Sequence, residues 1–380
     1  MTPGPHPDAV VVGAGIVGAA CAYEMARAGL SVLVCDAAFP GGGATSAGMG
    51  HIVVMDDSPA QLALTALSRL LWTELAPELP ADCEDVRAGT LWIAACEEEL
   101  PAVAEKRALC EAAGVSAEML DARALADAEP ALRPGLAGAL LVPDDRVLYP
   151  PNAARWFLDR AAAMGATVRP GTAATRVQAG AVTLHANGSA ETVHAGAIVL
   201  AAGIDTGSLI PGLGIVPRRG HLVITDRYPG LVRHQLVELG YLHSAHTMTG
   251  ASTAFNVQPR ATGQLLIGSS RELVGRESGI NRRIVREMLD RAVEFVPRLA
   301  GCAAIRTWTG FRPATADKLP LIGPWPALPG VWVAAGHEGL GITTATGTAA
   351  LIAASILGRP APMDPAPFRP DRPLPAAEAA

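Results

Sequence analysis

The apolar positions at the start of the chain form a short run, then a helical pattern, then a second short run. Residues 9–12 read Ala-Val-Val-Val, which is typical of a strand buried on both faces of a parallel sheet. Residues 19–28 carry apolar side chains at helical spacing, and Gly29 marks the end of that helix. Residues 31–35 form a second apolar run, followed by Asp36. The pattern predicts a strand, a helix and a second strand parallel to the first.

Three glycines lie where the first strand meets the helix, in the run Gly-Ala-Gly-Ile-Val-Gly at residues 13–18. Gly13 allows a tight turn, Gly15 lets the backbone approach a pyrophosphate, and Gly18 lets the helix pack closely on the strand. The alternative is a glycine-rich turn in an ordinary βαβ unit. The full order of strand, glycines, helix, strand and acid disfavours that alternative.

The start of the helix and the acid after the second strand complete a dinucleotide-binding unit. Ile16 and Val17 open the helix, where backbone N–H groups and the positive end of the helix dipole attract phosphates. Asp36 follows Gly18 by 18 residues and is placed to accept hydrogen bonds from a ribose. Because the unit begins almost at the N-terminus, it favours FAD over NAD as the cofactor.

The remaining apolar pattern alternates between helices and strands. Helical spacing predicts helices over residues 59–79, 97–114, 121–130, 152–165 with Asn152 as the N-cap, 281–299, and from a turn at 336–341 to residue 357. Strands are predicted at residues 90–95, 167–169, 173–177, 197–203, 215–225, 241–246, 254–259, 264–269 and 331–334, with a hairpin around residues 187–188. The tail from residue 359 is rich in proline, so we expect it to be extended or disordered.

Composition limits the class of protein. The 380 residues suffice for two domains, and a hydrophobic share of 50% supports a sizeable core. The net charge of −6 gives no sign of nucleic-acid binding. The six cysteines form no CxxC pair and no metal-ligand spacing, so we expect reduced thiols and no metal. Residues 1–7 do not resemble a signal peptide, and the apolar stretch 331–357 contains His337 and Glu338. We therefore expect a cytoplasmic protein with no integral membrane segment.

A second glycine-rich segment follows the dinucleotide-binding unit. Its crowded glycines indicate unusual backbone angles or backbone lying close to a ligand, and its hydroxyl groups can donate hydrogen bonds. We therefore expect a further cofactor contact here, with a flexible loop as the alternative. The residues concerned are Thr45, Ser46, Ala47, Gly48 and Gly50.

Five ordered motifs along nearly the whole chain resemble the FAD-dependent D-amino acid oxidase family, which includes glycine oxidase and sarcosine oxidase. They are GAGIVG at 13–18 with Asp36, ATSAG at 44–48, IVLAAG at 198–203, GFRPATADKLPLIG at 310–323 and GHEGLGITTATG at 336–347. Within the family, the chain is most similar to the flavin-bearing β subunits of multisubunit amine dehydrogenases. These include the D-hydroxyproline dehydrogenase, opine oxidase and hydrogen cyanide synthase types.

The resemblance implies an α/β fold in which a Rossmann-like FAD-binding domain is interleaved with a smaller antiparallel-sheet α+β substrate domain. The FAD-binding domain would span residues 1–81, 148–214 and 307–358, and the substrate domain residues 82–147 and 215–306, with 359–380 as a tail. Besides the residues above, the implied FAD contacts are Val177, Ala202, Gly203, Gly339, Leu340, Gly341, Ile342 and Thr343. A helix N-terminus after Gly341 would stabilise negative charge at the pyrimidine edge of the flavin.

Such an enzyme removes a hydride from the carbon next to an amine, and FAD carries the difficult step. Arg312 is the leading carboxylate anchor, because a planar guanidinium holds a carboxylate through two hydrogen bonds; a structural ion pair is the alternative. Tyr241, His51 and His337 are further candidates for the substrate site, and each has a packing role as its alternative. Glu338 departs from glycine oxidases, which tend to carry an aromatic residue and Arg in this turn.

The function implied by the resemblance is oxidation of a small amino acid, with a cyclic D-amino acid such as D-hydroxyproline as the first hypothesis. The alternatives are a true oxidase that uses oxygen, an opine oxidase subunit, and a flavin-binding scaffold subunit without chemistry. The segment 264–271 offers no lysine of the kind that monomeric sarcosine oxidases place over the flavin. We therefore expect electrons to pass to a partner subunit that holds an iron–sulfur cluster or a second flavin. No attachment motif is evident, so the FAD is expected to be non-covalent.

Overall fold

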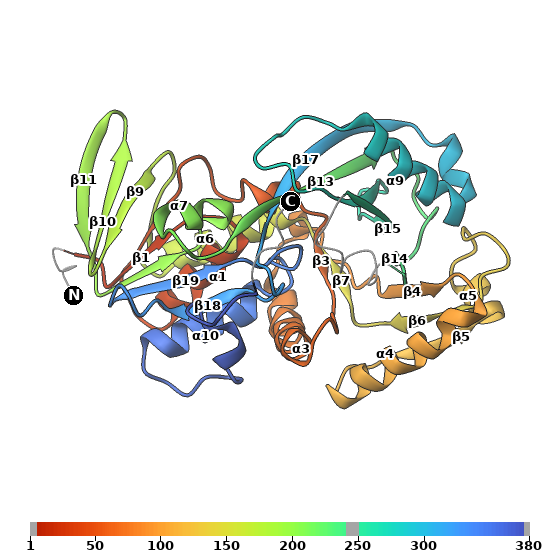
Figure 1. The fold of residues 1–380 in the computed structure, drawn as a ribbon, viewed down its shortest axis with the longest axis horizontal. Coiled ribbons are helices and arrows are strands. Elements are labelled where there is room, and N and C mark those ends of the chain that lie inside the picture. The colour runs from red at the N-terminus through yellow and green to blue at the C-terminus, as the bar shows by residue number, and fades with distance from the viewer. Residues whose placement is uncertain (1–5, 241–250, 376–380) are drawn as a thin grey trace.

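A computed structural model describes residues 6–240 and 251–375 of the chain. The predicted α/β fold is confirmed: the two large sheets lie in opposite halves of the molecule (Figure 1) and are connected by the long strands β13 and β17. The predicted strand at residues 241–246, and with it Tyr241, lies outside the described residues.

The first sheet has six strands in the order β18-β19-β12-β1-β2-β8. Their bounds are Leu321–Pro324, Val331–Ala335, Ala197–Leu200, Ala9–Val12, Val32–Cys35 and Thr167–Arg169. All neighbours pair in parallel except β18, which is an antiparallel edge strand. The carboxyl ends of the five parallel strands therefore meet at one edge of the sheet, which is where ligands bind in open α/β sheets.

The two faces of this sheet are covered by different layers. Val11 and Val199 point to one face, where they pack with helices α1 (Ile16–Arg27), α6 (Pro150–Ala163) and α10 (Ala345–Ile356). Val10 and Leu200 point to the other face and pack against a small antiparallel sheet. Its strands are β9 (Ala173–Gln178), β10 (Ala181–Ala186) and β11 (Ser189–His194). Burial on both faces explains why these strands read as continuous apolar runs.

The second sheet has eight strands in the order β17-β13-β16-β15-β14-β4-β6-β5. Their bounds are Ala304–Ala314, Val216–Thr225, Leu265–Arg271, Ser252–Pro259, Gln235–Glu238, Thr90–Ala94, Gly138–Val142 and Glu118–Asp121. On one face, Phe255 stacks on Phe295 of helix α9 (Arg282–Phe295) with ring centroids 4.4 Å apart. On the other face, Trp92 and Val237 pack with helix α4 (Leu100–Ala112) and with Val53 and Met55 from the first half of the chain.

Shorter elements connect the two sheets. Strand β3 (His51–Ile52) pairs with β7 (Arg146–Val147) between them. The other α-helices of the described residues are α2 (Ala44–Ala47), α3 (Pro59–Leu75), α5 (Ala122–Ala128) and α7 (Thr206–Leu209). Among residues 6–240 and 251–375, no helix combines the length and apolar character that crossing a membrane requires.

Two sequence-based expectations about local structure were wrong. Asn152 does not cap α6, which begins two residues earlier at Pro150 with Tyr149 as its N-cap; the Asn152 amide donates to the carbonyl of Asp82 instead. The tail is neither continuously extended nor disordered between residues 359 and 375, because turns and a short 3-10 helix at Ala366–Phe368 lie within it. Phe368 is fully buried against the first sheet, and Arg372 forms two hydrogen bonds with Asp317.

Candidate active site

The carboxyl edge of the six-stranded sheet carries the first glycine motif. Gly13 has a φ of +107°, and a Cβ there would lie 2.4 Å from the carbonyl oxygen of Ala201. A Cβ on Gly18 would lie 2.0 Å from the carbonyl oxygen of Gly13, so α1 packs on β1 only because glycine is present. Gly15 is the N-cap of α1 and supplies no side chain at that helix end. The geometry fits the tight turn assigned to Gly13 and the close packing assigned to Gly18, and the approach of Gly15 to a pyrophosphate stays a prediction.

Asp36 is tied to the same loop through the backbone. Its carboxylate accepts hydrogen bonds from the N–H groups of Ala14 at 2.7 Å and Ala38 at 2.8 Å. A carboxylate has about four acceptor positions, so these two bonds leave capacity for ribose hydroxyls. Thr45 acts from the second glycine segment: its hydroxyl accepts a hydrogen bond from the N–H of Ile16 at 3.0 Å. The two polar side chains hold the phosphate loop against its neighbours, and their contact with the cofactor stays a prediction.

The other predicted cofactor residues follow this edge, with one exception. Ala202 and Gly203 come directly after β12, and Gly48 lies close to Ile342, since a Cβ on Gly48 would be 2.8 Å from the Ile342 side chain. Ser46, Ala47 and Gly50 lie in and after α2, and Val17 and Gly18 in the first turn of α1. Val177 is different, because its side chain is buried in the apolar layer between β9 and the first sheet.

The loop between β19 and α10 is fixed by hydrogen bonds to both neighbours. The Trp72 indole donates to the carbonyls of Ile342 and Thr343 at 3.1 and 3.0 Å. The Thr343 hydroxyl donates to the carbonyl of His51 at 2.9 Å. On the other side, the N–H of Glu338 donates to the carbonyl of Pro313 at 2.8 Å. These bonds join the GHEGLG and GFRP motifs at one place.

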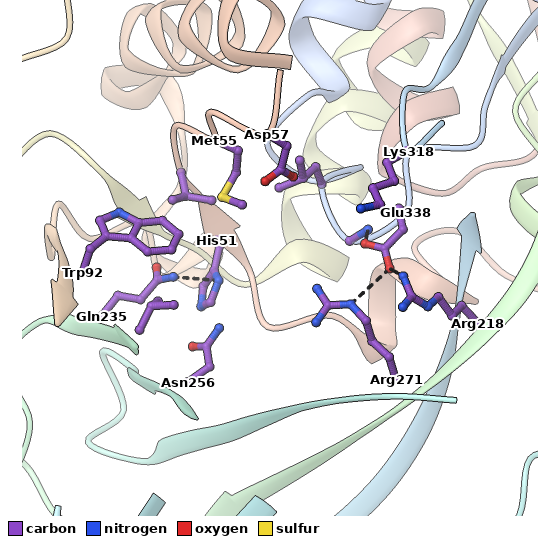
Figure 2. Close-up of a pocket in the computed structure, with 14 residues that line it drawn as sticks. His51, Met55, Asp57, Trp92, Arg218, Gln235, Asn256, Arg271, Lys318 and Glu338 are labelled. Carbon is purple, nitrogen blue, oxygen red and sulfur yellow. Dashed lines mark hydrogen bonds and ion pairs between the residues drawn. The ribbon is translucent and has the colours of Figure 1, made fainter. Parts of the chain in front are cut away.

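A pocket opens between this loop, the segment around β3 and the eight-stranded sheet (Figure 2). Figure 2 shows charged side chains gathered at one end and neutral side chains at the other. The lining residues are His51, Val53, Met55, Asp57, Trp92, Arg218, Gln235, Val237, Asn256, Arg271, Lys318, Glu338, Gly339 and Leu340.

Glu338 lies at the centre of the charged end. Its carboxylate is 3.4 Å from Nη1 of Arg218 and 3.4 Å from Nε of Arg271. Burial alone would raise the pKa of Glu338, but Arg271, Arg312 and Arg218 outweigh it and lower that pKa to about 2. Glu338 is therefore ionised throughout the physiological pH range.

Arg312 lies beside the pocket and is not among its lining residues. Arg312 in β17 is directly opposite Arg218 in β13, and its Nη1 donates to the carbonyl of Ser270 at 2.9 Å. The guanidinium packs on Gly220, where a Cβ would be 2.3 Å from Nη1. By contrast, Arg219 is bound to Glu272 at 3.0 Å, so this next residue of β13 is a structural ion pair.

Sequence reasoning named Arg312 but not Arg271, Lys318 or Asp57 as pocket residues. Lys318 has a φ of +64° in the turn before β18 and lines the charged end. Burial lowers the pKa of Lys318, whereas the nearby Asp57 acts in the opposite direction. Lys318 stands within the GFRPATADKLPLIG motif, so a search of that motif for charged residues would have found it.

The neutral end contains His51, Gln235 and Asn256. The Gln235 amide nitrogen is 2.7 Å from Nδ1 of His51, and burial lowers the pKa of His51 to about 3. His51 is therefore neutral, with Nδ1 as the acceptor and the proton on Nε2. Within the described part of the chain, Nε2 of His51, Oε1 of Gln235 and Oδ1 of Asn256 have no hydrogen-bond partner. Buried polar atoms of this kind are suited to a polar ligand.

His337 does not join this pocket. Its Nε2 is 3.0 Å from the hydroxyl of Thr348 in α10, and burial lowers its pKa to about 3. His337 is a neutral, packed residue beneath the loop, so the structure does not support the catalytic role considered from the sequence.

A parallel sheet with this glycine loop at its carboxyl edge, next to a polar pocket, is the architecture of a dinucleotide-dependent oxidoreductase. The model of the DAO family of FAD-dependent oxidoreductases matches residues 8–355, and the chain belongs to that family. The resemblance seen in the motifs is thereby confirmed, and FAD is the cofactor of the family.

Several known proteins are similar to the chain over almost its whole length. The hydrogen cyanide synthase subunit HcnC from Pseudomonas aeruginosa is 28% identical, with 98% of each chain covered. One subunit of opine oxidase from Agrobacterium tumefaciens is 27% identical over 92% of this chain and 93% of its own. The crystal structure of glycine oxidase from Geobacillus kaustophilus has 26% identity and a TM-score of 0.86, covering 97% of this chain and 100% of that one.

The residues present fit FAD. The N-terminus of α1 presents backbone N–H groups beside glycines, and a Cβ on Gly203 would meet no heavy atom within 4 Å among the described residues. The glycine loop would hold the pyrophosphate, Asp36 the ribose, and the loop of Gly339 to Thr343 the flavin end beside the pocket.

Proposed function

We propose that the protein oxidises the carbon–nitrogen bond of an amino acid to an imine. The substrate carbon loses a hydride and the nitrogen loses a proton, and FAD supplies the two-electron acceptor for the hydride. The observation that carries this proposal is the arginine cluster of Arg218, Arg271 and Arg312 beside the loop that would hold the flavin. Arginine binds carboxylates through paired hydrogen bonds.

The two ends of the pocket suggest separate tasks. The arginine end would bind the carboxylate and fix the direction in which the substrate enters. At the neutral end, Oε1 of Gln235 and Oδ1 of Asn256 are acceptors suited to the N–H groups of the amine. Neutral His51 orients Gln235 and does not compete with the substrate for a positive charge. Trp92 and Val237 line this end and are buried in an apolar cluster, so they would limit the access of water to the amine.

The finer assignment rests on sequence likeness. The sequence of the GHEGLGITTATG motif favours a D-hydroxyproline dehydrogenase β subunit, or another dehydrogenase of cyclic D-amino acids. Two relatives are named as enzyme subunits, of hydrogen cyanide synthase and of opine oxidase, which supports a partner subunit. We propose that this partner carries an iron–sulfur cluster or a second flavin. A scaffold role without chemistry is disfavoured by the polar pocket.

The test is flavin reduction by a panel of amino acids. Purified protein should contain non-covalent FAD that acid precipitation releases, and D-proline, D-hydroxyproline, glycine and dicarboxylic amino acids should be mixed with it anaerobically. Bleaching of the flavin absorbance by at least one amino acid is expected. If dithionite bleaches the flavin but no amino acid does, amino acid oxidation is excluded.

A further inference from the structure

A buried lysine lies next to the wall of the pocket. Lys106, in helix α4, exposes only 2% of its side chain and is not among the lining residues. Its Nζ lies 4.0 Å from the centroid of the Trp92 ring, and Trp92 does line the pocket (Figure 2). A positive charge over an indole at this distance is a cation–π contact, which is strongest where water is excluded. Lys106 therefore holds a wall residue from outside the pocket.

The same Nζ also holds a second part of the wall. It donates a hydrogen bond to the carboxylate of Asp56, whose side chain is 8% exposed. Asp56 stands between Met55 and Asp57 in the chain, and both of these neighbours line the pocket. One ammonium group thus connects β4, which carries Trp92, to the segment that follows β3.

Trp92 lacks the contact that usually orients a buried indole. Buried tryptophans normally donate a hydrogen bond from Nε1, as Trp72 does to the carbonyls of Ile342 and Thr343. Nε1 of Trp92 has no hydrogen-bond partner within the described part of the chain, although only 1% of the residue is exposed. Its other surroundings form an apolar cluster, to which Val237 belongs. The orientation of this ring therefore depends on packing and on Lys106.

The residue type suits this double contact. Arginine supplies all but two of the 30 positive side chains of the sequence, and the exceptions are Lys106 and Lys318. A guanidinium is a broad planar group, whereas an ammonium is a compact point charge. Only a compact group can face a ring and a carboxylate from a single atom in a site this closed.

We propose that Lys106 is a positioning residue of the substrate pocket: it fixes Trp92 and the segment at residues 55–57, and so limits the size of the uncharged part of the substrate. This proposal rests on the proposed amino acid oxidation and deepens it, because the wall lies at the end of the pocket opposite the arginines. Without the cation, the Trp92 ring is free to take other rotamers, and a bulkier group gains room.

A neighbouring acid decides the pH of the experiment. Asp145 is buried, and burial raises its pKa to about 7, whereas the positive charges of Arg69 and Lys106 act in the opposite direction. Removing Lys106 therefore raises the pKa of Asp145 further. At pH 6, Asp145 is largely neutral with or without Lys106, so its ionisation does not distinguish the variants.

The experiment measures how tightly carboxylates of different size bind to the FAD-loaded protein. Acetate, isobutyrate and cyclohexanecarboxylate are titrated by calorimetry at pH 6. The variant combines Lys106→Met with Asp56→Asn, because removal of both charges leaves no uncompensated ion in the interior. We expect the ratio of the acetate Kd to the cyclohexanecarboxylate Kd to rise at least about fivefold over wild type. FAD content and the urea midpoint, measured in parallel, show that the variant is folded.

A second background tests whether Lys106 acts through the indole. Trp92→Leu removes the ring, so adding the Lys106→Met and Asp56→Asn pair should then change the ratio by less than about twofold. A general loss of stability would not depend on Trp92 in this way. Arg107→Gln, a change at a half-exposed arginine next to Lys106 on α4, is the matched control and should leave the ratio unchanged.

Three outcomes would overturn the proposal: a wild-type ratio in the folded double variant, an equal rise in the Trp92→Leu background, or an equal rise in Arg107→Gln. These results are independent of flavin reduction, because they measure binding alone. An unchanged ratio removes the positioning role while the oxidation stands. If no amino acid bleaches the flavin, the oxidation is excluded, and a shifted ratio still supports the positioning role.

Discussion

The residues around Arg312 determine where its side chain can lie. Gly220 leaves room for the guanidinium, Pro313 restricts the backbone after it, and the carbonyl of Ser270 accepts one of its hydrogen bonds. The N–H of Glu338 donates to the carbonyl of Pro313, which brings the acid of the neighbouring loop to the same strand. From beside the pocket, Arg312 thus lowers the pKa of Glu338.

Replacing Arg312 by alanine should therefore impair substrate binding. Removing one partner of a buried charge pair costs roughly 2–5 kcal/mol. Arg312→Ala should lower kcat/KM for the best amino acid by roughly 30- to 3000-fold. Arg312→Lys should restore only part of the lost kcat/KM, because an ammonium group cannot form the two parallel hydrogen bonds of a planar guanidinium. Flavin reduction in a stopped-flow instrument measures both variants.

Two controls accompany this measurement. FAD content should stay near that of wild type, since Arg312 faces the substrate side. Arg306→Ala removes an exposed arginine of the same strand and should leave the kinetics unchanged. If Arg312→Ala reduces its flavin at the wild-type rate, the substrate carboxylate is bound by Arg218 and Arg271 instead.

Motifs predicted part of this site and could not predict the rest. The glycines and Asp36 act within a short segment, so their spacing along the chain carries their geometry. The arginine cluster is different, because Arg312, Arg218 and Arg271 come from strands that are neighbours in space and distant in sequence. Nothing local in the sequence distinguishes Arg218, which lines the pocket, from Arg219, which is bound to Glu272.

At the scale of elements, the C-terminal tail shows how an irregular segment can be held. Arg372 donates from Nε and Nη2 to the Asp317 carboxylate at 2.6 and 2.9 Å, and Nη2 also donates to the carbonyl of Leu319 at 2.7 Å. Burial alone would raise the pKa of Asp317, but the hydrogen bonds and charge of Arg372 outweigh it and hold that pKa below its usual range. The tail is thus fastened to the turn that carries Lys318.

Arg372→Gln should destabilise the protein by about 1.5–3 kcal/mol at pH 7, the range for hydrogen bonds to charged groups. Asp317 has a lower pKa in the folded state than its ordinary 3.8, so its stabilising contribution is present above that value and is lost as pH falls through the folded pKa. The difference between wild type and variant should therefore narrow in acid. Urea unfolding of both proteins from pH 7 down to pH 3 measures this difference in the free energy of unfolding.

The matched control is Arg359→Gln, an exposed arginine at the start of the tail, which should be neutral at every pH. A difference between Arg372→Gln and wild type that stays constant down to pH 3 would show that the ion pair with Asp317 does not stabilise the tail.

Elements were predicted well where local periodicity decides them. The unit β1-α1-β2 and helix α9 follow from apolar spacing. The structure adds that Asn281 caps α9, because its side chain accepts hydrogen bonds from the N–H groups of Arg283 and Ile284. The start of α6 was predicted two residues too late. Pro150 and Pro151 occupy the first turn of the helix, where their fixed φ is favourable and no N–H is needed, and Asn152 therefore lies inside the helix. Proline content led us to expect an extended or disordered tail, because composition cannot show that Phe368 is buried against the rest of the protein.

At the scale of the molecule, the pocket exists because two separately stabilised sheets meet. The six-stranded sheet supplies its carboxyl edge and the loop after β19, and the eight-stranded sheet supplies the arginines and the neutral wall (Figures 1 and 2). The division into two interleaved domains stays a prediction. Its boundary at residues 306–307 falls within β17, which pairs along its length with β13 and so connects both parts.

The last prediction concerns the electron acceptor. We expect the isolated chain to pass electrons to an artificial dye faster than to oxygen, because two of its relatives are named as enzyme subunits. The absence of a lysine from residues 264–271 no longer adds support, since Lys318 lines the pocket from a different turn. The measurement is dye reduction against peroxide formation with the best amino acid substrate.

Substitutions at Lys318 and Asp57 test whether Lys318 affects the ratio of peroxide formation to dye reduction. A positive charge near a flavin favours reduction of oxygen, but Lys318 is one of several charges at this end: Asp57 and Glu338 act against its charge, whereas Arg218 and Arg271 add to it. We therefore expect Lys318→Met to change the ratio of peroxide formation to dye reduction little, while Asp57→Asn, which removes an offsetting carboxylate, should raise it. Peroxide formation as fast as dye reduction in wild type would contradict the prediction. If Lys318→Met then forms peroxide more slowly than wild type, Lys318 promotes the reaction with oxygen.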